Sequence, residues 1–228
     1  MKNHVFVLLF TLCSLTSQSQ TLDSIFNTLK FRNIGPFRGG RSNAGSGVNG
    51  DPLTYYMTTT GGGVWKTNDA GQHWKNISDG FFSSGSVGAI SVSISNPNIV
   101  YVGMGEHAPR GVMTAHGDGV YKSIDAGLTW TNIGLKKTQH ISRIQIHPEN
   151  PNILWVAAQG ALHGKSNERG IYKSKDGGKS WKNVLYINSS TGASELSIDI
   201  NHPNVLYAAM WDHMRTPWKV ISGGPGSG

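Results

Sequence analysis

Three stretches of the chain each combine acidic, histidine and arginine side chains within a few residues. Such mixtures can perform acid and base chemistry or bind a polar ligand. The candidate catalytic carboxylates are Glu106, Asp118, Glu168 and Asp212. The candidate ligand-binding residues are Arg38, Arg41, His107, Arg110, His116, His163, Arg169, Trp211, His213, Arg215 and Trp218.

Two converging carboxylates could act as acid and base on a glycosidic bond. Arginines could hold a ligand carboxylate through paired hydrogen bonds, and tryptophans could stack on sugars. The competing interpretation is structural, because acids and arginines in neighbouring loops also pair to hold those loops in place. A metal site would draw on His107, His116, Asp118, His163 and His213, but their spacing lacks the close histidine pairs typical of zinc sites. We therefore expect neither a metal nor a cofactor.

A repeated phrase, Ser/Thr-x-Asp-x-Gly-x-x-Trp, indicates which elements position these stretches. A repeat period near fifty residues is typical of modules that bury their faces on one another. We expect the phrase to be structural: its carboxylate accepts backbone N–H bonds in a hairpin turn, its glycine takes a positive φ, and its tryptophan packs on the adjoining module. The residues of its three copies are Thr67, Asp69, Gly71 and Trp74; Ser123, Asp125, Gly127 and Trp130; and Ser174, Asp176, Gly178 and Trp181.

A second phrase alternates with the first and predicts the strands. Asn96-Pro97-Asn98 recurs as Asn150-Pro151-Asn152 and as His202-Pro203-Asn204. Each is a turn signal, and the apolar runs on both sides alternate with a period of two, as half-buried strands do. One unit is therefore strand, turn, strand, loop, strand, Asp phrase and strand, which is a four-stranded antiparallel blade.

The sequence thus predicts an all-β protein with the architecture of a β-propeller. We place the propeller at residues 37–228, with blades at about 40–77, 87–133 and 140–186 and an incomplete blade at 193–228. The loops between second and third strands gather on one face with the connections between blades, opposite the Asp-phrase turns. The three stretches rich in acids and histidines are such loops, so this loop face is where we expect function. About three and a half blades form an open part of a larger ring, whose remaining blades we expect from the same chain beyond Gly228.

The Asp phrase resembles the Asp-box, or BNR repeat, of sialidases, of sortilin-type (VPS10) receptors and of xyloglucan-cleaving propeller hydrolases. The run from Phe31 to Gly228 resembles the N-terminal part of bacterial sortilin-like secreted proteins, which are often labelled glycosyl hydrolases. This resemblance implies an exported module that binds peptide or glycan ligands on its loop face. The alternative that it implies is a sialidase-like or xyloglucanase-like glycoside hydrolase.

Two departures weigh against the hydrolase alternative. Residues 31–36 match the Phe/Tyr-Arg-Ile-Pro motif of sialidases only with two residues inserted. Thr60-Gly61-Gly62-Gly63 stands where the xyloglucan hydrolases carry Asp-Ile-Gly-Gly, so the carboxylate of their general base is missing.

The N-terminus predicts export. Lys2 precedes an apolar run over residues 5–13, and Ser17-Gln18-Ser19 offers a cleavage site, so residues 1–19 are a predicted signal peptide and residues 20–36 a lead segment. The destination is the periplasm, the outer membrane or the extracellular space. Cys13 is the only cysteine, which excludes disulfides from the processed chain. The formal net charge is +7, but basic residues are scattered, which argues against nucleic-acid binding. No later stretch is apolar enough to span a membrane.

Overall fold

The computed structural model describes residues 41–107 and 114–228, which belong to the compact unit formed by residues 40–228. The predicted signal peptide, the lead segment, Arg38 and Arg110 lie outside the described residues.

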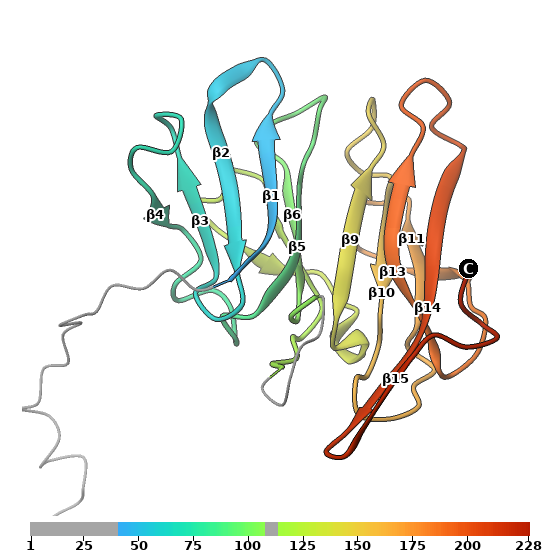
Figure 1. Ribbon diagram of the computed structural model, residues 1–228. Helices are drawn as coiled ribbons and strands as arrows, with labels where there is room; N and C mark the ends of the chain where they lie inside the picture. Colours follow the sequence, from blue (N-terminus) through green and yellow to red (C-terminus); the bar gives the residue numbers. More distant parts are fainter. Residues whose placement is uncertain (1–40, 108–113) are drawn as a thin grey trace, which may run out of the picture. The chain divides into compact units, whose positions relative to one another are not determined.

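The described residues form four antiparallel sheets in chain order (Figure 1). The first sheet contains β1 (Ser42–Val48), β2 (Asp51–Thr59), β3 (Val64–Thr67) and β4 (Lys75–Asn76). The second contains β5 (Val87–Val92), β6 (Val100–Met104), β7 (Val120–Ser123) and β8 (Thr131–Asn132). The third contains β9 (Ile141–Ile146), β10 (Leu154–Ala158), β11 (Gly170–Ser174) and β12 (Lys182–Leu185). The fourth contains β13 (Thr191–Ile198), β14 (Leu206–Thr216) and β15 (Lys219–Ser222).

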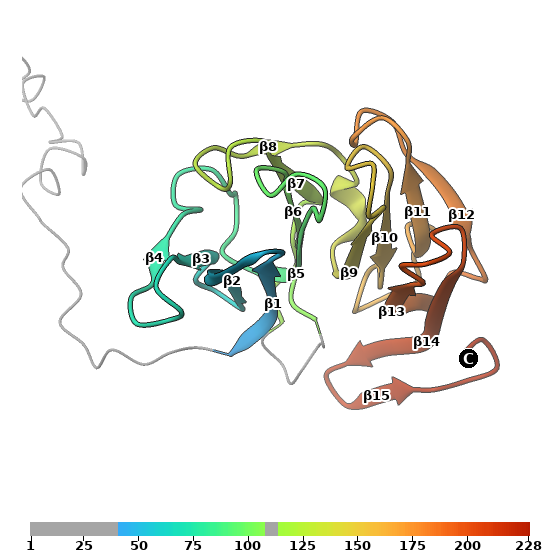
Figure 2. The same cartoon turned by 90° about the horizontal axis from the view of Figure 1, so that it is seen from above.

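The arrangement of the sheets confirms the predicted fold class, a partial β-propeller. The first strands β1, β5, β9 and β13 lie side by side in succession, and Figure 2 shows the sheets following one another in an arc with these strands inside. One 3-10 helix, η2 (Lys136–Thr138), lies in the connection between the second and third sheets.

The predicted Pro-Asn turns share one geometry. The N–H of Ile99 donates to the carbonyl of Asn96 at 2.9 Å, and the N–H of Ile153 donates to that of Asn150 at 3.0 Å. These turns and the Asp-box hairpins lie at one end of the sheets, the turn face. The loops between second and third strands and the connections between sheets lie at the opposite end, the loop face.

The core lies between successive sheets. Tyr56 and Val64 of the first sheet pack in one buried cluster with Tyr121 and Trp130 of the second. A similar cluster joins the second sheet to the third, and another joins the third to the fourth. Burial of this apolar surface is the main favourable term that holds neighbouring sheets together.

The Asp-box carboxylates are satisfied within their own hairpins. Asp125 accepts hydrogen bonds from the hydroxyl of Ser123 at 2.7 Å and from the N–H and hydroxyl of Thr129 at 2.9 and 2.6 Å. Asp69 and Asp176 form the equivalent bonds in their hairpins. These hydrogen bonds favour the charged form and lower the pKa of Asp125 and of Asp176 to about 2.

The fourth sheet differs from the expectation of an irregular loop over residues 211–218. β14 continues to Thr216 and pairs with β15, with His213 opposite Ser222. Pro217 and Trp218 form the tight turn between them, where the N–H of Lys219 donates to the Thr216 hydroxyl at 3.1 Å. Thr, Trp, Val and Ile favour strands and Pro fits a turn, so this stretch of the loop face is a projecting β-hairpin.

Candidate functional site

The candidate carboxylates of the second sheet have partners in the protein. Glu106 is 2% exposed and forms an ion pair with Arg41, which precedes β1. Asp118 is half-buried and accepts a hydrogen bond from the hydroxyl of Tyr121 at 2.8 Å. Both carboxylates therefore have contacts that hold local structure.

The other two candidate carboxylates are also bonded. Glu168 accepts a hydrogen bond from the hydroxyl of Tyr172 at 3.3 Å. Asp212 is buried and accepts hydrogen bonds from the hydroxyl of Thr191 and from the N–H of Gly226. None of the four candidates lines any of the cavities described for this part of the chain. Among the cavities lined by described residues, none therefore has two of these carboxylates facing each other across it.

Arg169, a candidate ligand-binding residue, is a buried structural group. Only 1% of the residue is exposed. Its guanidinium donates to the carbonyls of Gln159 at 2.6 Å, Ala161 at 2.5 Å, Gly164 at 3.1 Å and His213 at 3.3 Å. Burial lowers its pKa, and the nearby Asp212 carboxylate offsets part of that effect. Arg169 thus fastens the loop before β11 to strand β14.

The candidate histidines divide into buried and exposed groups. His213 is buried and packs against Trp211, with ring centroids 4.0 Å apart and the ring planes tilted by 32°. Burial lowers the pKa of His213, and it lowers that of the half-buried His107 to about 4. His116 and His163 are exposed. Among residues 41–107 and 114–228, no cluster of three or more His, Cys, Asp or Glu side chains is placed to hold a metal ion.

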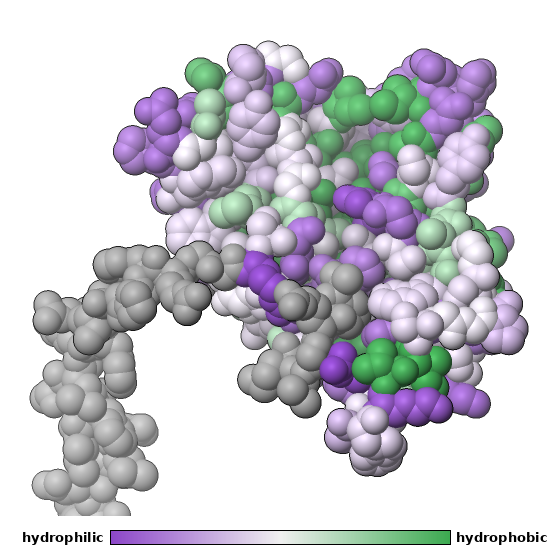
Figure 3. Space-filling view, viewed as in Figure 1, coloured by the Kyte–Doolittle hydropathy of each residue, from purple (hydrophilic) through white to green (hydrophobic). Residues whose placement is uncertain are grey.

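The loops of the third and fourth sheets meet on the loop face. The N–H of Arg215 donates to the carbonyl of Leu162 at 2.9 Å, and Nδ1 of His163 lies 3.3 Å from the carbonyl oxygen of Arg215. Trp218, at the tip of the β14–β15 hairpin, is 84% exposed. Val220 of the same hairpin is also exposed, and Figure 3 shows an apolar patch over the region of β15. His163 is thus in contact with Arg215, and Trp218 lies three residues further along the same hairpin.

Sequence reasoning missed an ion pair on the inner strands. Arg143 of β9 donates two hydrogen bonds to the carboxylate of Glu195 of β13, both at 2.5 Å. This contact lowers the pKa of Glu195. The signal was present in the repeat, because Arg143 and Glu195 precede Pro151 and Pro203 by the same number of residues.

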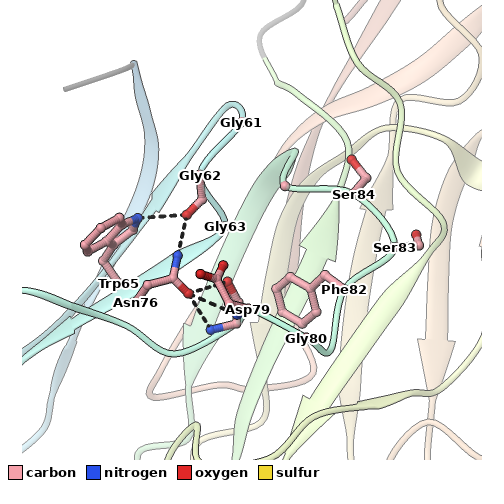
Figure 4. A pocket seen from close by; sticks show the side chains of 12 residues that line it. Gly61, Gly62, Gly63, Trp65, Asn76, Asp79, Gly80, Phe82, Ser83 and Ser84 are labelled. Atoms are coloured by element: carbon pink, nitrogen blue, oxygen red, sulfur yellow. Dashed lines mark hydrogen bonds between the residues drawn. The ribbon is translucent and has the colours of Figure 1, made fainter. Parts of the chain in front are cut away.

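Sequence reasoning also missed a cavity on the loop face of the first sheet (Figure 4). It has a volume of about 430 Å³ and lies between the β2–β3 loop and the β4–β5 connection. We call it the blade-one cup. Its lining residues of most chemical interest are Trp65, Asn76, Asp79, Phe82 and Ser83.

Asn76 holds the two sides of the cup together. Its side-chain amide donates to the carbonyl of Gly62 at 2.8 Å, and its amide oxygen accepts from the N–H groups of Ser78 and Asp79 at 2.9 and 3.0 Å. The indole N–H of Trp65 donates to the same Gly62 carbonyl at 2.8 Å, which fixes the orientation of the ring. The cup is therefore preorganised.

Glycines allow the two loops of the cup to touch. A Cβ atom at Gly85 would lie 2.6 Å from the carbonyl oxygen of Gly61, a backbone atom that cannot move aside. Gly63 has a φ of +69°, and a Cβ there would lie on the hydroxyl of Ser78. By contrast, a Cβ at Gly61 would meet nothing within 4 Å.

Fold and repeat together define a propeller protein built from Asp-box blades. The sequence profile of the family described as Sortilin-Vps10, "Sortilin, neurotensin receptor 3", matches residues 62–194. The chain belongs to this family. A search of curated proteins found no match.

Solved structures of similar fold include two enzymes of the GH74 class. One is an ancestral GH74 enzyme with a TM-score of 0.58 and 18% identity, covering 75% of this chain and 22% of that protein. The other is the GH74 enzyme of Niastella koreensis, with a TM-score of 0.54 and 21% identity, covering 75% of this chain and 26% of that protein. At these identities the likeness shows the fold alone. The present chain thus corresponds to about a quarter of the length of each relative.

In the part of the chain that the structure describes, no helix is long and apolar enough to cross a membrane.

Proposed function

We propose that this protein is an exported sortilin-like propeller module that binds peptide or glycan ligands through its loop face. Membership of the Sortilin-Vps10 family supports a propeller module. The observation that carries the binding role is the contact between the loops of the third and fourth sheets, where His163 lies against Arg215 and the tip of the same hairpin presents the exposed Trp218. An exposed aromatic ring beside hydrogen-bonding and cationic groups is typical of binding surfaces.

The bonding of the candidate carboxylates favours binding over glycoside hydrolysis. A hydrolase needs two carboxylates that flank the scissile bond, roughly 5–9.5 Å apart, in an accessible site. Glu106 is instead buried against Arg41, and Asp212 is buried against Thr191. Asp118 and Glu168 each accept a hydrogen bond from a tyrosine in the strand that follows them.

Export belongs to the same proposal. The predicted cleavage after Ser19 would leave Gln20 at the N-terminus of the processed protein, and the remaining blades of the ring would come from the same polypeptide. N-terminal sequencing and intact mass of the natively produced protein test both points. A retained Met1 would contradict export by this signal peptide.

Ligand screening tests the binding proposal itself. The folded protein is exposed to an array of neutral and anionic glycans and to a displayed library of random peptides, and each glycan that binds is then incubated with the protein and analysed for cleavage. We expect reversible binding with no cleaved product. Catalytic release of shortened glycans would contradict the proposal and support the hydrolase alternative.

A further inference from the structure

The blade-one cup has the chemistry of a sugar site. We propose that it binds one ring of a neutral saccharide, stacked on Trp65 and hydrogen-bonded by Asp79. This inference rests on the proposed function, because it assigns a ligand class to one part of the loop face. None of the residues in the cup was a candidate from the sequence.

The size of the cup suits a small ligand. A volume of about 430 Å³ lies near the lower end of the range for small-molecule sites, about 300–1,000 Å³. The loops on both sides are fixed by Asn76 and by the hydrogen bond from the N–H of Gly63 to the carbonyl of Gly85 at 2.9 Å. A ligand would therefore enter a preformed cavity and would not have to order it.

The charge in the cup excludes several ligand classes. Asp79 is the only ionisable side chain among the described residues that line the cup. A carboxylate with no cation of the described chain beside it repels phosphate, sulfate and carboxylate groups. A single carboxylate is also a poor site for a divalent metal ion, which prefers several oxygen ligands. Neutral ligands that are rich in hydrogen-bond donors remain compatible with this charge.

Asp79 is free to accept such donors. Its backbone N–H is held by Asn76, but its carboxylate accepts no hydrogen bond from any of the described residues, and the residue is exposed. Figure 4 shows this carboxylate in the view between the rings of Trp65 and Phe82. Sugar hydroxyls donate strongly to an ionised carboxylate.

The aromatic rings complete the match to a saccharide. Trp65 is half-buried, and its indole N–H is already bonded to Gly62, so the ring is held in one orientation. Phe82 is anchored against Tyr121, with ring centroids 4.6 Å apart. A sugar ring has an apolar C–H face and an edge of hydroxyl groups. It can therefore pack on an indole while its hydroxyls reach Asp79 and the serines Ser83 and Ser84.

Isothermal titration calorimetry tests the proposal with four neutral probes: cellotetraose, xylotetraose, mannotetraose and galactotetraose. We expect at least one of them to bind the folded protein. Gly61→Gln should fill the cup without disturbing the backbone, because a side chain at Gly61 meets open space and its φ is not positive. Gly164→Gln is the matched control, since Gly164 also faces open space but lies in the loop before β11.

Asp79→Asn is the second variant. Its control is Glu149→Gln, because Glu149 is also an exposed acid but lies on the turn face. Gly61→Gln and Asp79→Asn should each weaken binding by at least about tenfold, which corresponds to about 1.4 kcal/mol. The two controls should bind as the wild type does.

Two results would overturn the cup assignment. One is the absence of binding by all four saccharides. The other is binding that Gly61→Gln and Asp79→Asn leave unchanged. Neither result contradicts the broader proposal. A peptide or anionic glycan that binds elsewhere on the loop face would still bind more weakly to the Trp218→Ala variant. Conversely, one saccharide could bind in the cup while Trp218→Ala weakens the binding of no ligand. That result would support the cup assignment and contradict the broader proposal for the loop face.

Discussion

The indole N–H of Trp181 donates a hydrogen bond to the carbonyl oxygen of Ile133, which directly follows strand β8 of the preceding sheet, at 2.8 Å. Trp130 makes the same bond to Ile77 at 2.9 Å. The glycines of these two Asp-boxes pack beside the bond, because a Cβ at Gly178 would lie 2.3 Å from the side chain of Ile133 and one at Gly127 would lie 2.5 Å from that of Ile77. The second and third Asp-box hairpins therefore each hold their own sheet against the one before it.

Trp130→Phe and Trp181→Phe should each lower the free energy of unfolding, because each leaves a carbonyl without its donor and removes apolar contact. The lost hydrogen bond alone costs about 1 kcal/mol. Trp74→Phe is the control, since no described residue accepts a hydrogen bond from Trp74. Chemical denaturation measures all three. An equal loss for Trp74→Phe would contradict the fastening role.

The Asp-box carboxylates should make the fold sensitive to strong acid. In the unfolded chain an aspartate titrates near pH 4, but the folded pKa of Asp125 and of Asp176 is about 2. The folded state thus binds fewer protons, so this stabilisation is complete above about pH 4 and is lost as the pH falls toward about 2. Unfolding free energies measured across this window test the prediction. Asp125→Asn should flatten the slope.

His140 should add a second pH dependence at milder acidity. The residue is buried, with Nδ1 3.0 Å from the carbonyl oxygen of Glu106, and burial lowers its pKa from 6.5 to about 4. The unfolded chain takes up the proton first, so stability falls as the pH drops from about 6.5 to about 4. His140→Asn should reduce this slope in denaturation series at several pH values. A slope unchanged by the substitution would show that His140 does not titrate in this way.

Arg169 should be needed to hold the loop between β10 and β11 in its folded conformation. Arg169→Met keeps an apolar stem but leaves the carbonyls of Ala161 and Gly164 without their donor, which costs about 1–3 kcal/mol for each group that stays buried. We expect lower stability and faster amide exchange at Arg215, whose N–H bonds Leu162 of the same loop. Arg215→Met is the comparison, since its guanidinium has no such set of carbonyl acceptors in the described structure. Equal effects of both substitutions would contradict the role of Arg169.

The repeats made the fold predictable, because each Pro-Asn turn and Asp phrase carries its local geometry in its own residues. The candidate site was harder to predict from the sequence. Arg169 and Glu168 are adjacent in one loop. Arg169 is buried and donates hydrogen bonds to four carbonyl oxygens, whereas Glu168 accepts one from the hydroxyl of Tyr172. Sequence shows which side chains a loop carries but not which of them the neighbouring blade covers.

The blade-one cup illustrates the same limit. Its residues come from the β2–β3 loop and the β4–β5 connection, whose sequences are typical of ordinary glycine- and serine-rich loops. The two connections lie close together because Gly61 and Gly85 are in contact. No pattern of side chains in the sequence predicts such a backbone contact. The missing carboxylate at Thr60-Gly61-Gly62-Gly63 was visible in the sequence, whereas the presence of Asp79 beside those glycines was not.

The most direct test of the central claim compares ligand binding by variants of the two faces. His163→Ala with Trp218→Ala alters the loop face, while Ile124→Ala with Leu128→Ala alters exposed apolar residues of an Asp-box hairpin on the turn face, where Leu128 is 73% exposed. Binding of the ligands selected from the array and the peptide library is measured at equilibrium for both double variants. For ligands that bind outside the blade-one cup, we predict a loss of about tenfold or more for the loop-face pair and no change for the turn-face pair. Undiminished binding by the loop-face pair, with loss in the turn-face pair, would contradict it.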